Sequence, residues 1–481
     1  MPSLRGRKQH ARRSRSKRVS RPRVTARSHP RRRTLKGRSR KQLGGGHAIA
    51  SGAYGCVFKP ALRCRGEPSR PPAEARLVTK LGRASDMTTE FQLLQQVRGT
   101  LETIPNFRDY FVIDPVTACT PAPLEDDDLT DFNTTCHNFA HPPPSVPVLD
   151  AVSVNQNLES LTALTMPDGG QDLLEVLISG GPLSAVEFQG LNAKLIELLR
   201  DGIVPMNAAG LVHGDVKLEN IVAEVRTGED GTRVFGRVRL IDWGSSVPGV
   251  NEAPEALMGR PTKTGRFFTA NLPAGSVFLH EDPRTLDAML ARASSNPTPR
   301  ILAEYYYDGI TETATTDPRR AQVETEKITA LTDFIRAPPS VRKMMLPHVM
   351  TIIAQFYDRT GKHLDVERYA RTVFVKNCDV WGLLSVYCSL LTGGGLGFDP
   401  PRAFTTRAEK ILTSFMYDAG YAARPMNVGD LARYLATLSA LVVDERDARP
   451  NLKRARDGDG GDAEGGEADA SKHARGVDAD A

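Results

Sequence analysis

No stretch of the sequence approaches the eighteen or so uncharged apolar residues that a membrane-spanning helix needs. The N-terminus is basic and lacks the apolar core of a signal peptide. Cysteine is scarce, and the six residues form no CxxC pair: Cys56, Cys64, Cys119, Cys136, Cys378 and Cys388. These absences predict a soluble intracellular protein with reduced thiols, and they argue against a membrane protein, a disulfide framework or a structural metal site.

Acidic residues are missing from residues 1–41, which hold 18 Lys or Arg. The chain has 63 bases and 57 acids, so the remainder carries 63 − 18 = 45 bases against 57 acids, a net charge of −12. Such a basic run would repel itself if compacted, and we expect residues 1–43 to form a disordered arm. The arm could bind nucleic acid or another polyanion through phosphate contacts, serve as an import signal, or be a solvated extension. Residues 453–481, rich in Gly, Asp, Glu and Ala, are also expected to be disordered.

Between these tails the pattern changes from strand-like to helical. IASGAYGCVF and EARLVTKLG are typical of strands around a glycine turn, and TTEFQLLQQVRGTLETI has the spacing of an amphipathic helix. The Pro-rich and acid-rich residues 120–147 are predicted to be a surface insertion, and helical segments dominate from Ser184 onward. This order predicts a small strand-rich lobe followed by a larger helical lobe.

A glycine-containing motif opens the strand-like part. Glycines in a strand-turn-strand let backbone amides approach phosphate oxygens, and Val57 would cover an adenine ring. A plain hairpin is the alternative, because Ala50 stands where the G-x-G-x-x-G pattern has its first glycine. The candidate ATP-binding residues here are Ile49, Ala50, Ser51, Gly52, Ala53, Tyr54, Gly55 and Val57.

Two further motifs are more specific, and they follow in the order that phosphoryl transfer needs. Leu211 to Val222, LVHGDVKLENIV, places Asp215 to accept a hydroxyl proton, Lys217 to contact the γ-phosphate, and Asn220 as a metal ligand. His213 would brace this loop. The strand that begins at Leu240 then leads to Asp242 in LIDWG, a candidate ligand for magnesium bridging the ATP phosphates.

With these motifs the sequence resembles the eukaryotic-type protein kinase superfamily. GAYGCVFKPALRC, LTMPDGGQDL and NLPAGSVF are more narrowly similar to serine/threonine kinases of large nucleocytoplasmic DNA viruses. The resemblance covers residues 49–276 and 377–452. It implies an α+β, bilobal fold, with an N-lobe at 44–168 and a helical C-lobe at 169–452 that contains a helical insertion near 277–376.

The resemblance also assigns roles to residues outside the three motifs. Lys80 matches the strand lysine that contacts the α- and β-phosphates, and Glu90 best matches its helix partner. Met166 would lie in the hinge that binds adenine, MPDGG, where an ordinary turn is the alternative, and Asp172 would begin the next helix. Asp379 matches the buried aspartate that anchors the catalytic loop, and Arg449 matches the late arginine of the large lobe.

Two departures from the family pattern have consequences. Gly214 replaces the arginine of H-R-D that pairs with an activation-loop phosphate, so we expect no requirement for loop phosphorylation; H-G-D also occurs in kinase-like enzymes that act on small molecules. Trp243 replaces the usual Phe of D-F-G and leaves the metal ligand intact. Asn271-Leu272-Pro273 is the better candidate for the peptide-binding end of the segment, because Ala253-Pro254-Glu255 follows Asp242 too closely.

The sequence therefore predicts a serine/threonine protein kinase that uses ATP and Mg²⁺, with a protein Ser or Thr hydroxyl as acceptor. Lys217 favours Ser or Thr over Tyr. The alternatives are a pseudokinase scaffold and a basic, nucleic-acid-associated structural protein. Expected partners are a protein substrate and, through residues 1–41, nucleic acid or another polyanion, with no membrane. The expected location is the cytoplasm or nucleus of a host cell, or a virion.

Overall fold

The computed structural model describes residues 46–52, 55–72, 76–142, 146–257, 271–280, 341–358, 363–392 and 394–442. The chain divides into two units, Met1–Gly44 and Gly45–Ala481, and all described residues belong to the second. The predicted basic arm, the acidic tail and Arg449 therefore lie outside the described residues, as does much of the predicted insertion at 277–376.

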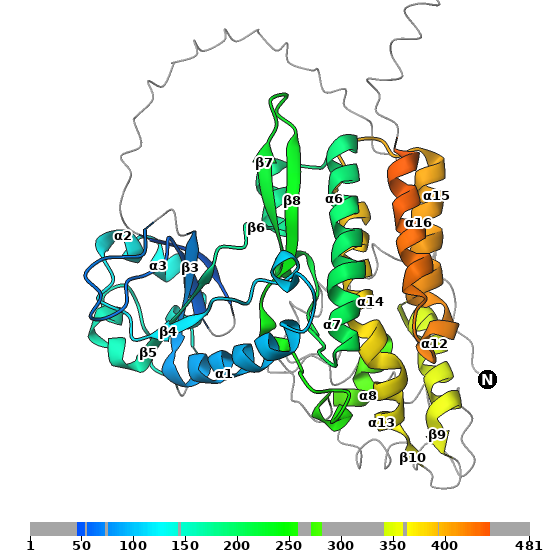
Figure 1. The fold of residues 1–481 in the computed structure, drawn as a ribbon, viewed down its shortest axis with the longest axis horizontal. Coiled ribbons are helices and arrows are strands. Elements are labelled where there is room, and N and C mark those ends of the chain that lie inside the picture. The colour runs from blue at the N-terminus through cyan, green and yellow to red at the C-terminus, as the bar shows by residue number, and fades with distance from the viewer. Residues whose placement is uncertain are drawn as a thin grey trace, which may run out of the picture. The chain divides into compact units, whose positions relative to one another are not determined.

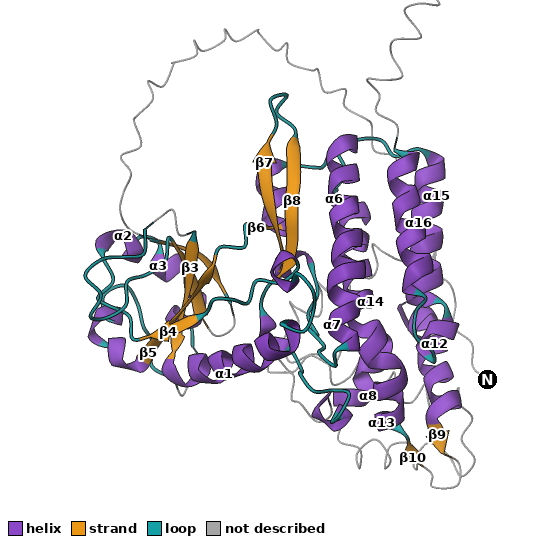
Figure 2. Ribbon diagram, in the orientation of Figure 1, coloured by secondary structure: helices purple, strands orange, loops and turns teal. Residues whose placement is uncertain are grey.

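The first part of the described chain forms a five-stranded antiparallel sheet in the order β1-β2-β3-β5-β4 (Figures 1 and 2). Its strands are β1 (His47–Ser51), β2 (Gly55–Lys59), β3 (Leu77–Arg83), β4 (Thr117–Cys119) and β5 (Leu161–Pro167). Helix α1 (Ala84–Leu101) follows β3 without a loop. Its buried residues Met87, Leu94, Val97 and Leu101 recur at intervals of seven, three and four, so they share one helix face. The predicted strands and helix are present.

The segment expected to be a surface insertion is instead part of the core. It contains three short helices, α2 (Asp126–Leu129), α3 (Phe132–Thr135) and α4 (His137–Ala140). Phe132 and Phe139 are fully buried, their rings stack with centroids 5.7 Å apart, and Phe132 also contacts Phe58 of β2. The expectation was wrong because its Pro and acidic residues concealed apolar residues whose partners lie far away in the sequence.

A second antiparallel sheet, β6-β7-β8, begins the helical part of the chain. Its strands are β6 (Gln171–Asp172), β7 (Ile221–Thr227) and β8 (Arg233–Leu240). Asp172 caps α5 (Leu173–Gly180) by accepting a hydrogen bond from the Glu175 amide. Burial raises the pKa of this Asp172 carboxyl. The sequence correctly placed the start of a helix here.

Long helices form the rest of the described chain (Figure 2). They include α6 (Ala185–Glu197), α12 (Val341–Phe356), α14 (Val375–Thr392), α15 (Arg402–Leu412) and α16 (Val428–Leu441). The shorter elements are α7 (Val204–Ala208), α8 (Val277–His280), α13 (Val366–Tyr369) and the hairpin of β9 (Tyr357–Asp358) and β10 (His363–Leu364). A capping box between Ser184 and Glu187 starts α6. Buried Asn192 on α6 joins three helices, because it bonds Tyr387 of α14 and both Leu435 and Ser439 of α16.

Buried apolar side chains form two clusters. The smaller lies between the first sheet and residues 120–160, and it includes Phe58, Leu81 and Phe132. The larger joins the helices, the second sheet and the buried face of α1. Helix α12, which lies within the predicted helical insertion, packs on this larger cluster through Val349, Ile352, Ile353 and Phe356.

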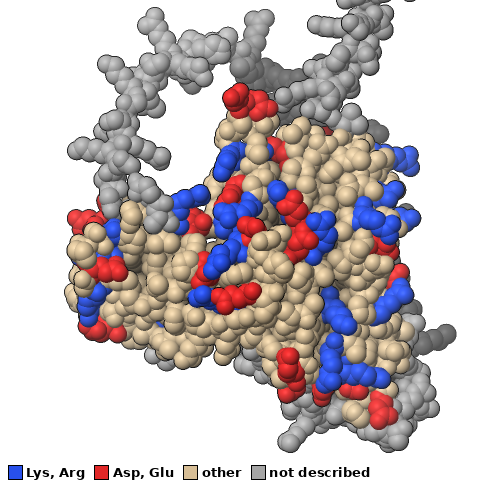
Figure 3. All heavy atoms as spheres, in the orientation of Figure 1, with Lys and Arg blue, Asp and Glu red and all other residues tan. Residues whose placement is uncertain are grey.

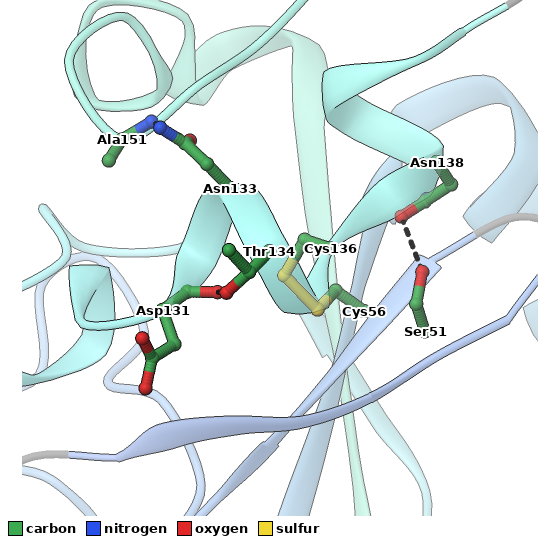
Figure 4. Close-up of a disulfide and its surroundings, with 8 residues drawn as sticks. All are labelled: Ser51, Cys56, Asp131, Asn133, Thr134, Cys136, Asn138 and Ala151. Carbon is green, nitrogen blue, oxygen red and sulfur yellow. Dashed lines mark hydrogen bonds between the residues drawn. A yellow bond between two sulfur atoms is a disulfide. The ribbon is translucent and has the colours of Figure 1, made fainter. Parts of the chain in front are cut away.

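Four of the six cysteines are paired, which corrects the expectation of reduced thiols. Disulfides join Cys56 to Cys136 (Figure 4) and Cys64 to Cys119, across 80 and 55 residues of sequence. The expectation failed because scattered spacing says nothing about which residues the fold brings together. The pairing also removes the support that cysteine usage gave to a reducing compartment. Cys378 and Cys388 are free, and burial raises the pKa of both thiols.

The surface of the described residues carries charges of both signs. Figure 3 shows Lys and Arg interspersed with Asp and Glu on one face, and ion pairs such as Arg237 with Asp109 and Glu224 contribute to this mixture. Among the described residues, none of the helices has the length and apolar composition needed to cross a membrane.

Candidate functional site

The first site pair joins the sheet to α1. Lys80 lies on the middle strand β3, where it is paired with Val57 of β2 and Leu164 of β5. Its Nζ donates to both carboxylate oxygens of Glu90, at 2.6 and 2.8 Å. Both side chains are largely buried, with 14% and 11% exposed, which strengthens the pair relative to a surface ion pair. The structure thus brings together the lysine and glutamate that the sequence matched across ten residues.

The glycine motif forms the β1–β2 hairpin. Ile49, Ala50, Ser51 and Gly52 are exposed, whereas Val57 is half-buried; Ala53 and Tyr54 lie outside the described residues. Sterics require glycine at position 55, because a Cβ on Gly55 would lie 2.7 Å from the Leu81 carbonyl oxygen and 3.1 Å from Lys80 Cγ. The glycine allows β2 to approach the strand that carries Lys80.

Several hydrogen bonds converge on the Asp215 carboxylate. One oxygen accepts hydrogen bonds from Lys217 Nζ at 2.7 Å and from Asn220 Nδ2 at 3.0 Å. The other accepts from Asn271 Nδ2 at 2.9 Å. Three donors from two segments therefore fix the direction of this carboxylate, while 26% of its side chain stays exposed. A carboxylate held in this way can accept a proton from a group that approaches from solvent.

The loop that carries Asp215 is held from behind. Asp379 of α14, only 1% exposed, accepts the backbone N–H groups of His213 at 2.8 Å and Gly214 at 2.9 Å, and the side chain of Asn207 at 2.7 Å. His213 is fully buried; its Nδ1 accepts the Asp215 amide, so its Nε2 donates to the Ile241 carbonyl. The structure therefore places Asp379 and His213 where the sequence expected scaffold residues.

Strand pairing brings the two candidate metal ligands together. Ile221 of β7 pairs with Leu240 of β8, and the Ile241 amide donates to the Asn220 carbonyl at 3.0 Å. Asn220 and Asp242 thus leave the same end of the hairpin. Asp242 adopts φ 62° and ψ 72°, a left-handed conformation that non-glycine residues rarely occupy and that clusters at functional sites. Its exposed carboxylate makes no hydrogen bond or ion pair with the described residues.

Trp243 ties the segment that carries Asp242 to Phe111 and Val112, which follow α1 in the chain. Its indole N–H donates to the Val112 carbonyl at 3.2 Å, and its ring packs edge-on against Phe111 and beside His213. The Val112 amide in turn donates to the Leu240 carbonyl. The segment that follows α1 and the strand that precedes Asp242 are therefore connected both by Trp243 and by this backbone hydrogen bond, and a phenylalanine could not make the indole hydrogen bond.

Gly214 is required by the backbone. It has φ +74°, and a Cβ on it would lie 3.0 Å from the Ser245 carbonyl oxygen. An arginine at this position would carry both the strain of that conformation and a close contact.

The predicted hinge continues from β5. Met166 pairs with Val78 of β3, and Asp168 forms an ion pair with Lys59 at 2.7 Å. Buried Arg239 donates to the Gly169 carbonyl, and burial lowers the pKa of its guanidinium. The turn is thus fixed by side chains from both sheets.

Asn271 is a site residue whose chemical role the sequence does not predict. It begins the candidate peptide-binding segment Asn271-Leu272-Pro273, and its side chain donates hydrogen bonds to Asp215 and to the Val216 carbonyl. The Asn271 side chain lies 56 positions after Asp215 in the sequence, and a contact at that separation produces no periodic pattern. The order of the segments along the chain is the one indication that the sequence offers. The described residues contain no cluster of three His, Cys, Asp or Glu fit to hold a metal, so a cation between Asn220 and Asp242 would need oxygens from elsewhere.

Comparison with known proteins adds little to this geometry. No protein-family model matches the sequence, and no curated protein matches it. Among solved structures, a crystal structure of the BubR1 kinase domain is similar over 85% of this chain and 82% of that chain, at 12% sequence identity and a TM-score of 0.34. A similarity at that TM-score assigns neither a fold family nor a function to this chain. The similarity to viral kinases remains a prediction.

Proposed function

We propose that this protein is a serine/threonine protein kinase, which transfers the γ-phosphate of Mg-ATP to a protein hydroxyl group. The observation that carries the proposal is the convergence of Lys217, Asn220 and Asn271 on the Asp215 carboxylate. The fold that fits this role is bilobal and kinase-like, with the first sheet and α1 as the small lobe and the remaining helices as the large one.

Each of these residues has a separate role in phosphoryl transfer. Asp215 orients the acceptor hydroxyl and takes its proton, and its three donors keep the carboxylate in the direction of the acceptor. Lys217 is close enough to Asp215 to lie beside both the acceptor and the transferred phosphate. Lys80, held by Glu90, presents its ammonium to the α- and β-phosphates. Positioning and charge would supply most of the rate.

The donor set near Asp242 suits magnesium. Asn220 gives its amide N–H to Asp215, which leaves the amide oxygen as a ligand, and Asp242 adds a carboxylate. Mg²⁺ is bound by few carboxylates and otherwise by phosphate and water oxygens, which fits two protein ligands. When bound, the ion would offset the negative charge of the phosphates.

Two rival functions make different demands on these residues. A pseudokinase scaffold would not need an ordered Asp215, Lys217 and Asn220 together. A basic structural protein would depend on residues 1–41, which lie outside the described residues and outside this site. The small-molecule kinase suggested by His213-Gly214-Asp215 differs in its acceptor, so it is separated from the proposal by the substrate that becomes labelled.

The test is phosphotransfer from labelled ATP with magnesium to generic protein substrates, followed by phosphoamino-acid analysis. We expect phosphoserine or phosphothreonine. Asp215→Asn should lower kcat by about 10²- to 10⁴-fold while nucleotide still binds, because the carboxylate faces the acceptor. Asp399→Asn, a change of an exposed aspartate elsewhere, is the matched control. Near-normal turnover by Asp215→Asn would contradict the catalytic assignment.

A further inference from the structure

The end of the β1–β2 hairpin is tied twice to one short segment (Figure 4). Ser51 and Cys56 are directly paired across the two strands, just before the turn. Cys56 forms its disulfide with Cys136, and the Ser51 hydroxyl donates to Asn138 Oδ1 at 3.1 Å. Both members of the last strand pair are therefore attached to residues only two positions apart.

That segment is a firm anchor. We call residues 131–141, which contain α3 and α4, the clamp segment. Phe132, Cys136 and Phe139 within it are fully buried in the smaller hydrophobic cluster. Its Asn133 side chain accepts the Ala151 amide at 2.8 Å, and the Phe139 carbonyl accepts the Leu149 amide. The bonds to Leu149 and Ala151 thus fix the clamp segment to the core in addition to its contacts with β2.

Strand β2 of the hairpin is also held by its pairing with β3, from Gly55 to Phe58, whereas β1 has fewer contacts of this kind. β1 is an edge strand that pairs only with β2 within its sheet, and a register irregularity interrupts the pairing between Ala48 and Ala50. Four consecutive residues, Ile49 to Gly52, are exposed. An exposed edge hairpin of this kind would sample many positions, and its ordering would oppose the binding of any ligand that needs one of them.

We propose that the clamp segment positions the hairpin for nucleotide phosphates, with the Cys56–Cys136 disulfide and the Ser51–Asn138 hydrogen bond as the positioning contacts. The inference rests on the proposed function, because it supplies the phosphate ligand. Asn138 and Cys136 act through the hairpin and do not touch the nucleotide. The affinity for ATP then depends on the redox state of one cysteine pair.

The redox step is an ordinary thiol–disulfide exchange. A dithiol reductant gives two electrons and two protons to the Cys56–Cys136 bond, which becomes two thiols, and the reductant becomes a disulfide. Both cysteines are fully buried, so a reductant needs the clamp segment to open first. Substitution is therefore the cleaner way to remove the bond.

The experiment compares two pairs of variants in the full chain. Cys56→Ser/Cys136→Ser removes the clamp disulfide, and Cys64→Ser/Cys119→Ser removes the other disulfide of the same region, which does not contact the hairpin end. Asn138→Ala keeps both disulfides and removes only the Ser51 contact. Its control is Asn157→Ala, an exposed residue whose side chain donates to the Ser153 carbonyl.

The readouts are KM for ATP, kcat, and the Kd for a fluorescent ATP analogue. Loss of the clamp disulfide should raise KM and Kd about tenfold, and Asn138→Ala about threefold, because binding must then order the hairpin. The value of kcat should change less than KM, and both controls should resemble the wild type. Equal effects of the two disulfide variants, or an unchanged Kd for Asn138→Ala, would overturn the inference. Wild-type protein that binds no ATP analogue would instead overturn the proposed function, and the inference with it.

Discussion

Replacing Asp379 tests how the buried carboxylate of α14 supports the loop before Asp215. In Asp379→Ala, three buried donors lose their acceptor: the His213 and Gly214 amides and the Asn207 side chain. Hydrogen bonds to a charged group contribute about 1.5 to 3 kcal/mol each, while removing the buried charge recovers part of its desolvation cost. We expect the free energy of unfolding to fall by about 3 to 5 kcal/mol.

The isosteric change separates hydrogen bonding from packing. In Asp379→Asn, one amide oxygen can still accept two of the bonds, but the NH₂ group then faces the third donor. We expect a loss of about 2 to 3 kcal/mol. With an m-value of about 3 kcal/mol/M, urea midpoints should fall by about 1 M for Asn and more for Ala.

Intrinsic fluorescence during urea unfolding is a suitable assay, because both tryptophans of the chain, Trp243 and Trp381, are buried near this loop. Asp399→Asn is again the matched control. Both Asp379 variants should also lower kcat, since the two backbone amides immediately precede Asp215. A urea midpoint for Asp379→Asn equal to that of the control would refute the assignment of Asp379 as the anchor of this loop.

The other predictions concern Trp243, Gly214, His348 and the basic residues 1–41. Trp243→Phe should cost about 1 to 1.5 kcal/mol in urea unfolding, because the Val112 carbonyl loses its donor, and it should weaken magnesium-dependent nucleotide binding. Gly214→Ala should cost about 1 to 2 kcal/mol because of its positive φ, and phosphatase treatment should leave wild-type activity unchanged. Burial lowers the pKa of His348 from 6.5 to about 4, so the unfolded chain binds more protons between these values. The contribution of His348 to the free energy of unfolding is fully present above pH 6.5 and falls by about 2 kcal/mol on acidification to about pH 5. The variant His348→Phe should not show this loss in urea titrations at the two pH values. Deleting residues 1–41 should abolish salt-sensitive retention on DNA without loss of kinase activity; equal retention would leave targeting as the role of the arm.

The sequence by itself predicted several local elements and the residues proposed for the site. Gly55, Asp215, Asn220 and Asp242 could be proposed because each lies in a short motif whose spacing is typical of a turn or a strand end, and Lys80 was assigned through the family resemblance. Strands β1, β2 and β3 and helix α1 were predicted from local patterns, which depend only on neighbouring residues.

Only the tertiary structure decided the features that join distant segments. The pairing of Cys56 with Cys136, the bond from Asn271 to Asp215 and the contact of Trp243 with Val112 each close a long loop of chain. No local pattern encodes such a closure, because it results from the packing of whole helices and sheets. The same reason explains the wrong expectation for residues 120–147: their polar composition was read correctly, but their buried aromatic residues acquire partners only when β2 folds against them.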